Sequence, residues 1–141
     1  MTFFHTLETT ASPSSVWAVW TDVARWPEWD SELRDAQLTG DFRVGAEGRL
    51  TPKRGPRLKF VIVQADWGKS YTYITQLPLC RLKVYRYMRL GGPPLSFTHE
   101  VSFEGLLGFF FSWLLGRQFQ SVLPGVMQSV RVRAEAASMT K

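Results

Sequence analysis

Residues 119–137 read FQSVLPGVMQSVRVRAEAA and predict a long amphipathic helix. Apolar residues recur in this stretch at spacings of three and four, which places them on one helical face. Pro124 lies inside the apolar stripe and removes one helical hydrogen bond, so with Gly125 beside it we expect a kink or a break. The stripe consists of Phe119, Leu123, Val126, Val130, Ala134 and Ala137.

The middle of the chain carries the signals of an antiparallel sheet. Between Leu33 and Glu104, short runs rich in β-branched and aromatic residues alternate with Gly and Pro. The connections are too short for parallel crossovers, so we expect consecutive strands to pair as antiparallel neighbours. The predicted strands cover residues 33–39, 47–53, 58–66, 70–78, 81–90 and 96–104, with turns at 41–45, 53–56, 67–68 and 91–94.

The N-terminal part of the chain predicts a strand followed by two short helical segments. Residues 3–8 alternate with a period of two, as in a strand with one buried face. A Ser-Pro pair at 12–13 is typical of a helix start. A Trp-Pro pair at 26–27 ends that helix, because the residue before a proline is pushed out of the α region, and a second short helix or turn should hold Trp29. The apolar face of the first helix is Val16, Val19, Trp20 and Val23.

Length and composition indicate a single globular domain over residues 1–141. The net charge of +5 would suit an anionic partner. However, the basic residues are weakly clustered, and solvated strand edges commonly carry Lys and Arg, so we expect no nucleic-acid partner. The basic residues in question are Lys53, Arg54, Arg57, Lys59, Arg81, Lys83, Arg86 and Arg89.

Cysteine usage and the first residues favour a cytoplasmic protein. Cys80 is the lone cysteine and cannot form an internal disulfide, so we expect an inert buried thiol. The N-terminus lacks the basic start and apolar stretch of a signal peptide. The apolar stretch 106–116 is about half as long as a bilayer-spanning helix and is closed by Arg117, so we expect no transmembrane segment.

The predicted elements make a helix-grip arrangement, which consists of a strand, a helical elbow, a meander and a terminal helix. Several short motifs along the chain also occur in the order seen in one known family. The stretches ASP at 11–13, VW at 16–17, WPEWD at 26–30 and FRVGAEG at 42–48 resemble the polyketide cyclase/dehydrase-like group of the START-like (SRPBCC) superfamily. The resemblance implies an α+β fold in which a curved antiparallel seven-stranded sheet wraps a long C-terminal helix, with two short helices after the first strand. It also implies a hydrophobic cavity, used across the superfamily for lipids, hormones and polyketides and in some members for catalysis.

Strand alternation indicates which side chains face that cavity, since positions two apart share a face. Aromatic bodies with a few polar tips are typical of a small-molecule pocket, although the same residues would also suit an ordinary core. The two tryptophans of the elbow could gate ligand access or cap the core. The predicted ligand-binding residues are Trp26, Trp29, Phe60, Ile62, Tyr71, Tyr73, Arg86, Met88, Phe97, His99, Phe119 and Leu123.

Arg86 and His99 are the two residues of this set whose side chains could bind a charged group or transfer a proton. Arg86 points inward among apolar residues and must find a partner there. Either it holds a ligand carboxylate or enolate, or it pairs with a carboxylate such as Asp35 or Asp66, or its strand end is open to water. His99 is either a buried neutral imidazole bonded to a neighbour or a general acid or base.

Three functions therefore compete. The first is binding of a small hydrophobic or amphipathic ligand, and the second is a cyclase- or aromatase-like enzyme. The third is a protein-interaction module without a ligand, in which Phe109–Leu115 forms an interface such as a homodimer contact rather than a lid. No nucleophile with an adjacent base, phosphate loop or carboxylate pair stands out, which favours binding. Besides His99, the sequence has only His5 and Cys80 as histidine or cysteine ligands for a metal, so we expect no metal site and no cofactor.

Overall fold

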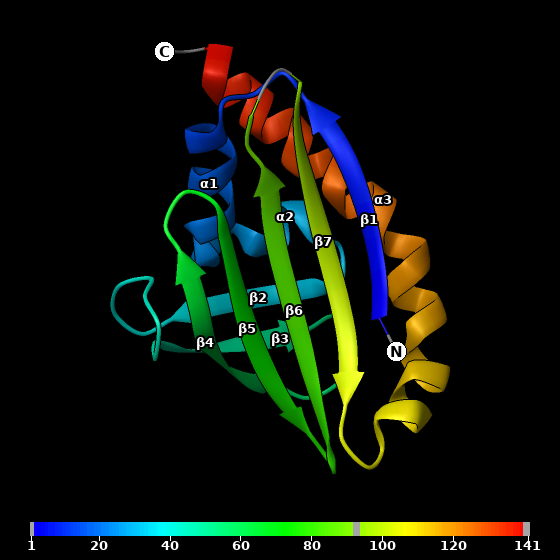
Figure 1. The fold of residues 1–141 in the computed structure, drawn as a ribbon. Helices are drawn as coiled ribbons and strands as arrows, with labels where there is room; N and C mark the ends of the chain where they lie inside the picture. The colour runs from blue at the N-terminus through cyan, green and yellow to red at the C-terminus, as the bar shows by residue number, and fades with distance from the viewer. Residues whose placement is uncertain (1, 92–93, 140–141) are drawn as a thin grey trace.

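A curved antiparallel sheet of seven strands and one long helix make up most of the fold over the described residues (Figure 1). The structure is a computed structural model and describes residues 2–91 and 94–139. The strand order is β1-β7-β6-β5-β4-β3-β2, so β1 pairs with the last strand of the chain. The elements are β1 (Thr2–Thr9), α1 (Pro13–Thr21), the 3-10 helix η1 (Val23–Arg25), α2 (Trp26–Trp29), β2 (Leu33–Leu38), β3 (Glu47–Pro52), β4 (Leu58–Asp66), β5 (Ser70–Leu77), β6 (Cys80–Arg89), β7 (Leu95–Glu104) and α3 (Gly108–Met139).

The predicted meander is confirmed. All six predicted strands between Leu33 and Glu104 are present, and their ends differ from the prediction by at most one residue. The turn predicted at 91–94 lies partly outside the described residues, which stop at 91 and resume at 94. One detail was wrong: the basic residues of β6 lie on a strand between β7 and β5, not at an edge of the sheet.

The helical elbow after β1 is present but more broken than expected. Ser12 caps α1 as predicted, since its hydroxyl accepts a hydrogen bond from the backbone N–H of Ser15 at 3.2 Å. The helix ends at Thr21 rather than near Trp26, because Asp22 adopts a ψ of 77° that no helix continues. The short elements η1 and α2 then carry the chain to β2.

The long helix α3 continues through Pro124, so a break there was a wrong prediction. Pro124 has no N–H, so the Gln120 carbonyl loses its helical hydrogen-bond donor. Both residues are exposed. Water can therefore satisfy the freed carbonyl, and the helix tolerates the proline. Within the described ranges, none of the helices combines the length and hydropathy needed to cross a bilayer.

The helices cover one face of the sheet in two parts. α3 packs on β1 and β7, while the elbow lies against β2 (Figure 1). Trp26 of the elbow also contacts aromatic side chains of β4 and β5. Alternation along β6 is regular, so Arg86 and Met88 face the interior as predicted, and Cys80 is buried. The large aromatic side chains gather between the elbow and these strands.

Gly48 of β3 permits this aromatic packing. A Cβ at this position would lie 2.4 Å from both the Phe60 ring and the Gln37 carbonyl oxygen. We predict that Gly48→Ala lowers the free energy of unfolding by about 1–3 kcal/mol, because overpacking displaces a ring and a backbone group together. Urea unfolding followed by circular dichroism measures the change.

Gly125→Ala is the matched control, since a Cβ there meets no atom within 4 Å and the residue is helical and exposed. Helix propensity predicts that this change stabilises the protein by about 0.5–1 kcal/mol. Equal effects of the two substitutions would show that Gly48 has no packing role.

Candidate functional site

The guanidinium of Arg86 lies inside a box of four aromatic rings. Its Cζ is 5.0 Å from the ring centroids of both Trp26 and Trp29, 5.7 Å from that of Tyr71 and 5.6 Å from that of Tyr73. Arg86 is only 4% exposed. At these distances the ring faces attract the cation, and the attraction is stronger where water is excluded.

The polar atoms of Arg86 are incompletely paired. Nη1 donates to the Tyr71 hydroxyl at 2.5 Å, but Nε is buried without a hydrogen-bond partner within the described chain. The ion pairs formed by the described residues involve Arg25, Lys59 and Arg133, so Arg86 has no carboxylate within salt-bridge distance. The predicted pairing with Asp35 or Asp66 was therefore wrong, and so was a strand end open to water.

Asp30 is the carboxylate whose charge acts on this site. Burial raises the pKa of Asp30, while the nearby Arg86 charge and a backbone hydrogen bond from Glu32 oppose the rise. Burial also raises the pKa values of Tyr71 and Tyr73, so both phenols are neutral at neutral pH. The site therefore combines a buried cation, neutral phenol hydroxyls and one carboxyl with a raised pKa.

Trp20 connects the elbow to the strands. Its backbone carbonyl accepts hydrogen bonds from Trp26 Nε1 at 2.8 Å and from the Tyr71 hydroxyl at 3.5 Å. This carbonyl lies in the last turn of α1, where helical partners are missing. The indole Nε1 of Trp20 donates to His99 Nε2 at 3.1 Å.

His99 is therefore a neutral imidazole with an occupied Nε2. Burial, the Arg86 charge and His5 on the neighbouring strand hold the pKa of His99 well below its usual range. Because Nε2 accepts from Trp20, the ring proton belongs on Nδ1. This arrangement matches the prediction of a buried neutral histidine, and Nε2 is not free to take a proton from a substrate.

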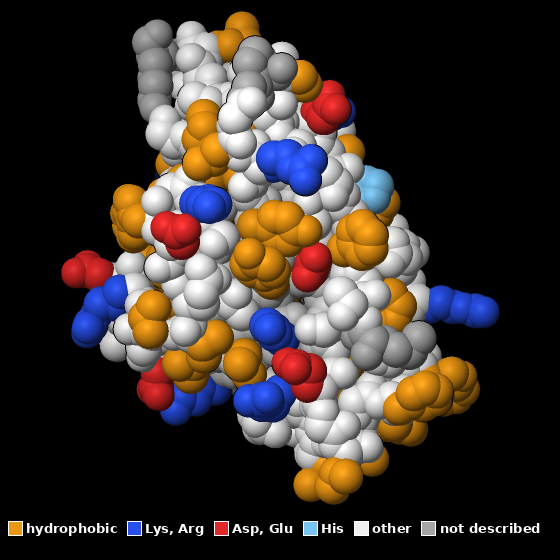
Figure 2. Space-filling view, in the orientation of Figure 1, with side chains coloured by type: hydrophobic (Ala, Val, Ile, Leu, Met, Phe, Trp, Pro, Cys, Tyr) orange, Lys and Arg blue, Asp and Glu red, His pale blue; other side chains and the backbone are white. Residues whose placement is uncertain are grey.

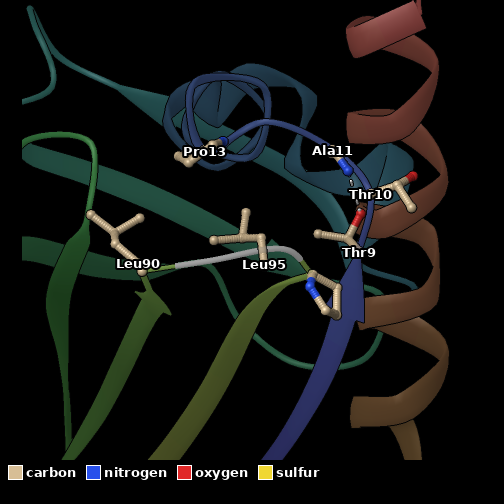
Figure 3. Close-up of a pocket in the computed structure, with 8 residues that line it drawn as sticks. Thr9, Thr10, Ala11, Pro13, Leu90 and Leu95 are labelled. Carbon is tan, nitrogen blue, oxygen red and sulfur yellow. Dashed lines mark hydrogen bonds between the residues drawn. The ribbon is translucent and has the colours of Figure 1, made fainter.

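Arg86 and the four rings around it are each at most 5% exposed, so they pack against one another and do not border the open cavity that the sequence led us to expect. Two hollows stand out among the described residues, and none of the twelve predicted ligand-binding residues lines either of them. The larger, of about 710 Å³, lies where the start of α1 meets the ends of β6 and β7 (Figure 3). It is lined by Thr9, Thr10, Ala11, Pro13, Leu90, Gly91, Pro94 and Leu95.

This hollow opens at one end of the inner face that carries the candidate site. Met88 and Arg86 share that face of β6, and Leu90 follows just beyond the end of the strand. Leu95, Phe97 and His99 share the same face on β7. Met88 and Phe97 are opposite each other in the strand register and are both buried. They therefore separate the hollow from Arg86 and His99.

The structure brings most of the predicted residues together. Phe60 stacks on Trp26, Ile62 is opposite Tyr73 in the register, and Phe97 contacts the His99 ring. The two α3 residues lie apart. Phe119 packs on Phe103 and is half-buried, and Leu123 is buried outside the main core cluster. The residues placed in or around the box and its histidine are Trp26, Trp29, Phe60, Tyr71, Tyr73, Arg86, Phe97 and His99.

Sequence reasoning missed Trp20 and Asp30. Trp20 had a signal, because it lies on the apolar face of the first helix. Asp30 ends the WPEWD stretch, but nothing in that pattern shows that the carboxyl turns toward a strand more than fifty residues later. Among residues 2–91 and 94–139, His, Cys, Asp and Glu side chains form no group of three that could hold a metal ion.

Comparison with known proteins connects this geometry to a family. Residues 2–135 match the family model described as polyketide cyclase/dehydrase and lipid transport. No curated protein matches the sequence.

Solved structures share the fold at low sequence identity. A START superfamily protein from Mycobacterium smegmatis is 15% identical with a TM-score of 0.72, the match covering 96% of this chain and 98% of that one. Norcoclaurine synthase from Thalictrum flavum, in complex with dopamine and hydroxybenzaldehyde, is 13% identical with a TM-score of 0.72, covering 100% and 88%. The di-domain aromatase/cyclase StfQ of the steffimycin pathway is 12% identical with a TM-score of 0.77, covering 98% of this chain and 51% of StfQ. They confirm the predicted helix-grip fold.

The buried His99 predicts a specific dependence of stability on pH. Its pKa is near 6.5 when unfolded and lower when folded, so the unfolded chain binds the extra proton as the pH falls below about 6.5. We expect the wild type to lose up to about 1.4 kcal/mol per pH unit from this group, and His99→Gln to lose correspondingly less. Urea unfolding between about pH 7.5 and pH 5.5 measures both slopes.

His5→Gln is the control for this measurement, because His5 lies opposite His99 on β1 and is only half-buried. It should leave most of the slope in place. If His99→Gln and wild type have the same slope, the imidazole is not held neutral by the fold.

Proposed function

Because the chain belongs to the polyketide cyclase/dehydrase and lipid transport family, we propose that it binds a small hydrophobic or amphipathic molecule, lipid- or polyketide-like, at the Arg86 box. Arg86 holds the acidic or carbonyl end of that molecule, and the aromatic rings contact its apolar part. The observation that carries the proposal is a buried guanidinium with no carboxylate of the described residues within salt-bridge distance and no hydrogen-bond partner for its Nε among them.

Such a group is costly as a purely structural element. A buried charge with incomplete hydrogen bonding destabilises a fold, and replacement by an apolar residue of similar volume is often neutral or stabilising. A planar guanidinium has the donor geometry that suits a carboxylate or an enolate. Trp29 Nε1 is also buried, has no hydrogen-bond partner in the described part of the chain and adds a second donor beside Arg86.

A ligand reaches the box through the hollow at the ends of β6 and β7. Its apolar lining suits the alkyl or aromatic end of the molecule, and the separating pair Met88 and Phe97 has to move. Met is unbranched and adapts readily to a changed neighbour, which makes Met88 the easier of the two to displace. A fold relative that binds dopamine and hydroxybenzaldehyde gives a precedent for small aromatic ligands.

The other predictions from the sequence stay open beside this one. An aromatase- or cyclase-like activity would need a proton donor or acceptor, and Asp30, with its raised pKa beside Arg86, is the group best placed for that role. We keep a cytoplasmic location and the absence of a nucleic-acid partner as proposals. A homodimer through 109–115 is the alternative to the lipid contact proposed below for the same surface.

Substitution of Arg86 separates the functional role from a structural one. We predict that Arg86→Leu weakens binding of a fatty acid such as oleate by more than about tenfold, because the anchoring donors are lost. Binding of the matching fatty alcohol should change by less than about threefold. Isothermal titration calorimetry measures both affinities, and circular dichroism checks that Arg86→Leu remains folded.

Arg89→Leu is the matched control, since Arg89 is an exposed cation on the same strand. It should leave both affinities unchanged. Equal losses for the acid and the alcohol in Arg86→Leu would remove the anchoring role. Native mass spectrometry of the purified protein tests binding independently, because a protein that carries no small molecule and binds neither probe contradicts the proposed function.

A further inference from the structure

The first half of α3 buries small residues and exposes large apolar ones. Gly108, Ser112 and Gly116 are spaced four apart and are buried. A Cβ on Gly116 would lie 2.3 Å from the Phe3 ring, and one on Gly108 would lie 2.9 Å from the Phe103 carbonyl oxygen. Large side chains therefore have no room at these positions, although Phe111 and Leu115 are half-buried and pack against the core. Most of the other large apolar side chains in this part of the helix face outward, unlike those of an ordinary amphipathic helix.

The large apolar residues form one exposed surface at an end of the molecule. Leu107 N–H donates to the Leu79 carbonyl at 2.9 Å, which joins the β5–β6 turn to the start of α3. Leu106 is 86% exposed, Phe109 78% and Trp113 75%. Figure 2 shows apolar side chains projecting at this lower end of the molecule. We call this surface the apolar tip, and it consists of Leu79, Leu106, Phe109, Phe110, Trp113 and Leu114.

Two arginines adjoin the apolar tip, and the carboxylates near them are Glu104 and Glu32, which accepts a hydrogen bond from Gln118. From Gly105 to Ala134 the sequence contains no Asp or Glu, and the first charged residue after the tip is Arg117. Arg117 is exposed and lines a shallow hollow of about 320 Å³ with Trp113 and Leu114. Arg81 is exposed just after the β5–β6 turn, opposite the half-buried Glu104.

We propose that the apolar tip docks the protein on a lipid surface that contains anionic phospholipids. Trp and Phe side chains enter the boundary between headgroups and acyl chains, while an adjacent Arg reaches the phosphates. Charge favours this partner over a second copy of the chain. A symmetric contact through the tip would bring the two Arg117 residues together on chains that each carry a net charge of +5, whereas anionic lipids neutralise them.

Vesicle binding tests the proposal directly. We expect the wild type to float with vesicles of phosphatidylcholine and phosphatidylglycerol, and Trp113→Ser to reduce the partition coefficient by about tenfold or more. Trp67→Ser is the matched control, because Trp67 is an exposed tryptophan on the β4–β5 turn, at the other end of β5. Arg117→Glu should weaken binding to the anionic vesicles and leave the weaker binding to pure phosphatidylcholine unchanged.

Fluorescence quenching by brominated acyl chains gives a second readout on the folded protein. We expect anionic brominated vesicles to quench the wild type and Trp67→Phe more than Trp113→Phe, since the indole of Trp113 enters the lipid. Failure of the wild type to bind anionic vesicles overturns the proposal. So does a wild-type dimer that becomes monomeric in Trp113→Ser without any vesicle binding, because the tip is then a contact between copies. Neither outcome bears on ligand binding at Arg86, which needs no lipid surface.

Discussion

The enclosure of the Arg86 guanidinium by aromatic rings determines how the elbow sits on the sheet. α2 is only four residues long and has little helical stability of its own. Its position comes from Trp26 and Trp29, which both lie 5.0 Å from the Arg86 Cζ, and from the bond between the Trp26 indole and the Trp20 carbonyl. A charge on a strand thus fixes a helical segment that precedes it by more than fifty residues.

The same contacts explain why the aromatic interior is tightly packed and yet leaves some buried polar atoms without a hydrogen-bond partner among the described residues. Aromatic side chains from α1, α2, β4 and β5 fill the space with edge-to-face and stacked contacts. Their few polar atoms then compete for a small number of acceptors, and Trp29 Nε1, Arg86 Nε and Thr75 Oγ1 are left without one in the described chain. Several unpaired donors in one region are unusual for a core, and they are the chemical reason to assign it a ligand.

Local patterns predicted most of the fold, because strand alternation and turn residues act over a few positions. The inward direction of Arg86 and His99 followed from alternation on β6 and β7 and is confirmed. Their partners could not be predicted, since Tyr71 and Trp20 come from other segments whose distance depends on the whole sheet. The packing of the interior likewise depends on how side chains from several elements fit together, and sequence periodicity does not predict that fit. The continuity of α3 through Pro124 depends on which side of the helix faces solvent.

The position of β1 in the sheet has a consequence for how the chain folds. β2 to β7 form a ladder of hairpins between neighbours in sequence, which can close early because their loops are short. β1 instead pairs with β7, so that Thr2 lies opposite Ser102. During synthesis the first strand emerges long before its partner exists, and its apolar side stays uncovered until the last strand and α3 arrive. The beginning of the chain is therefore among the last parts to become native.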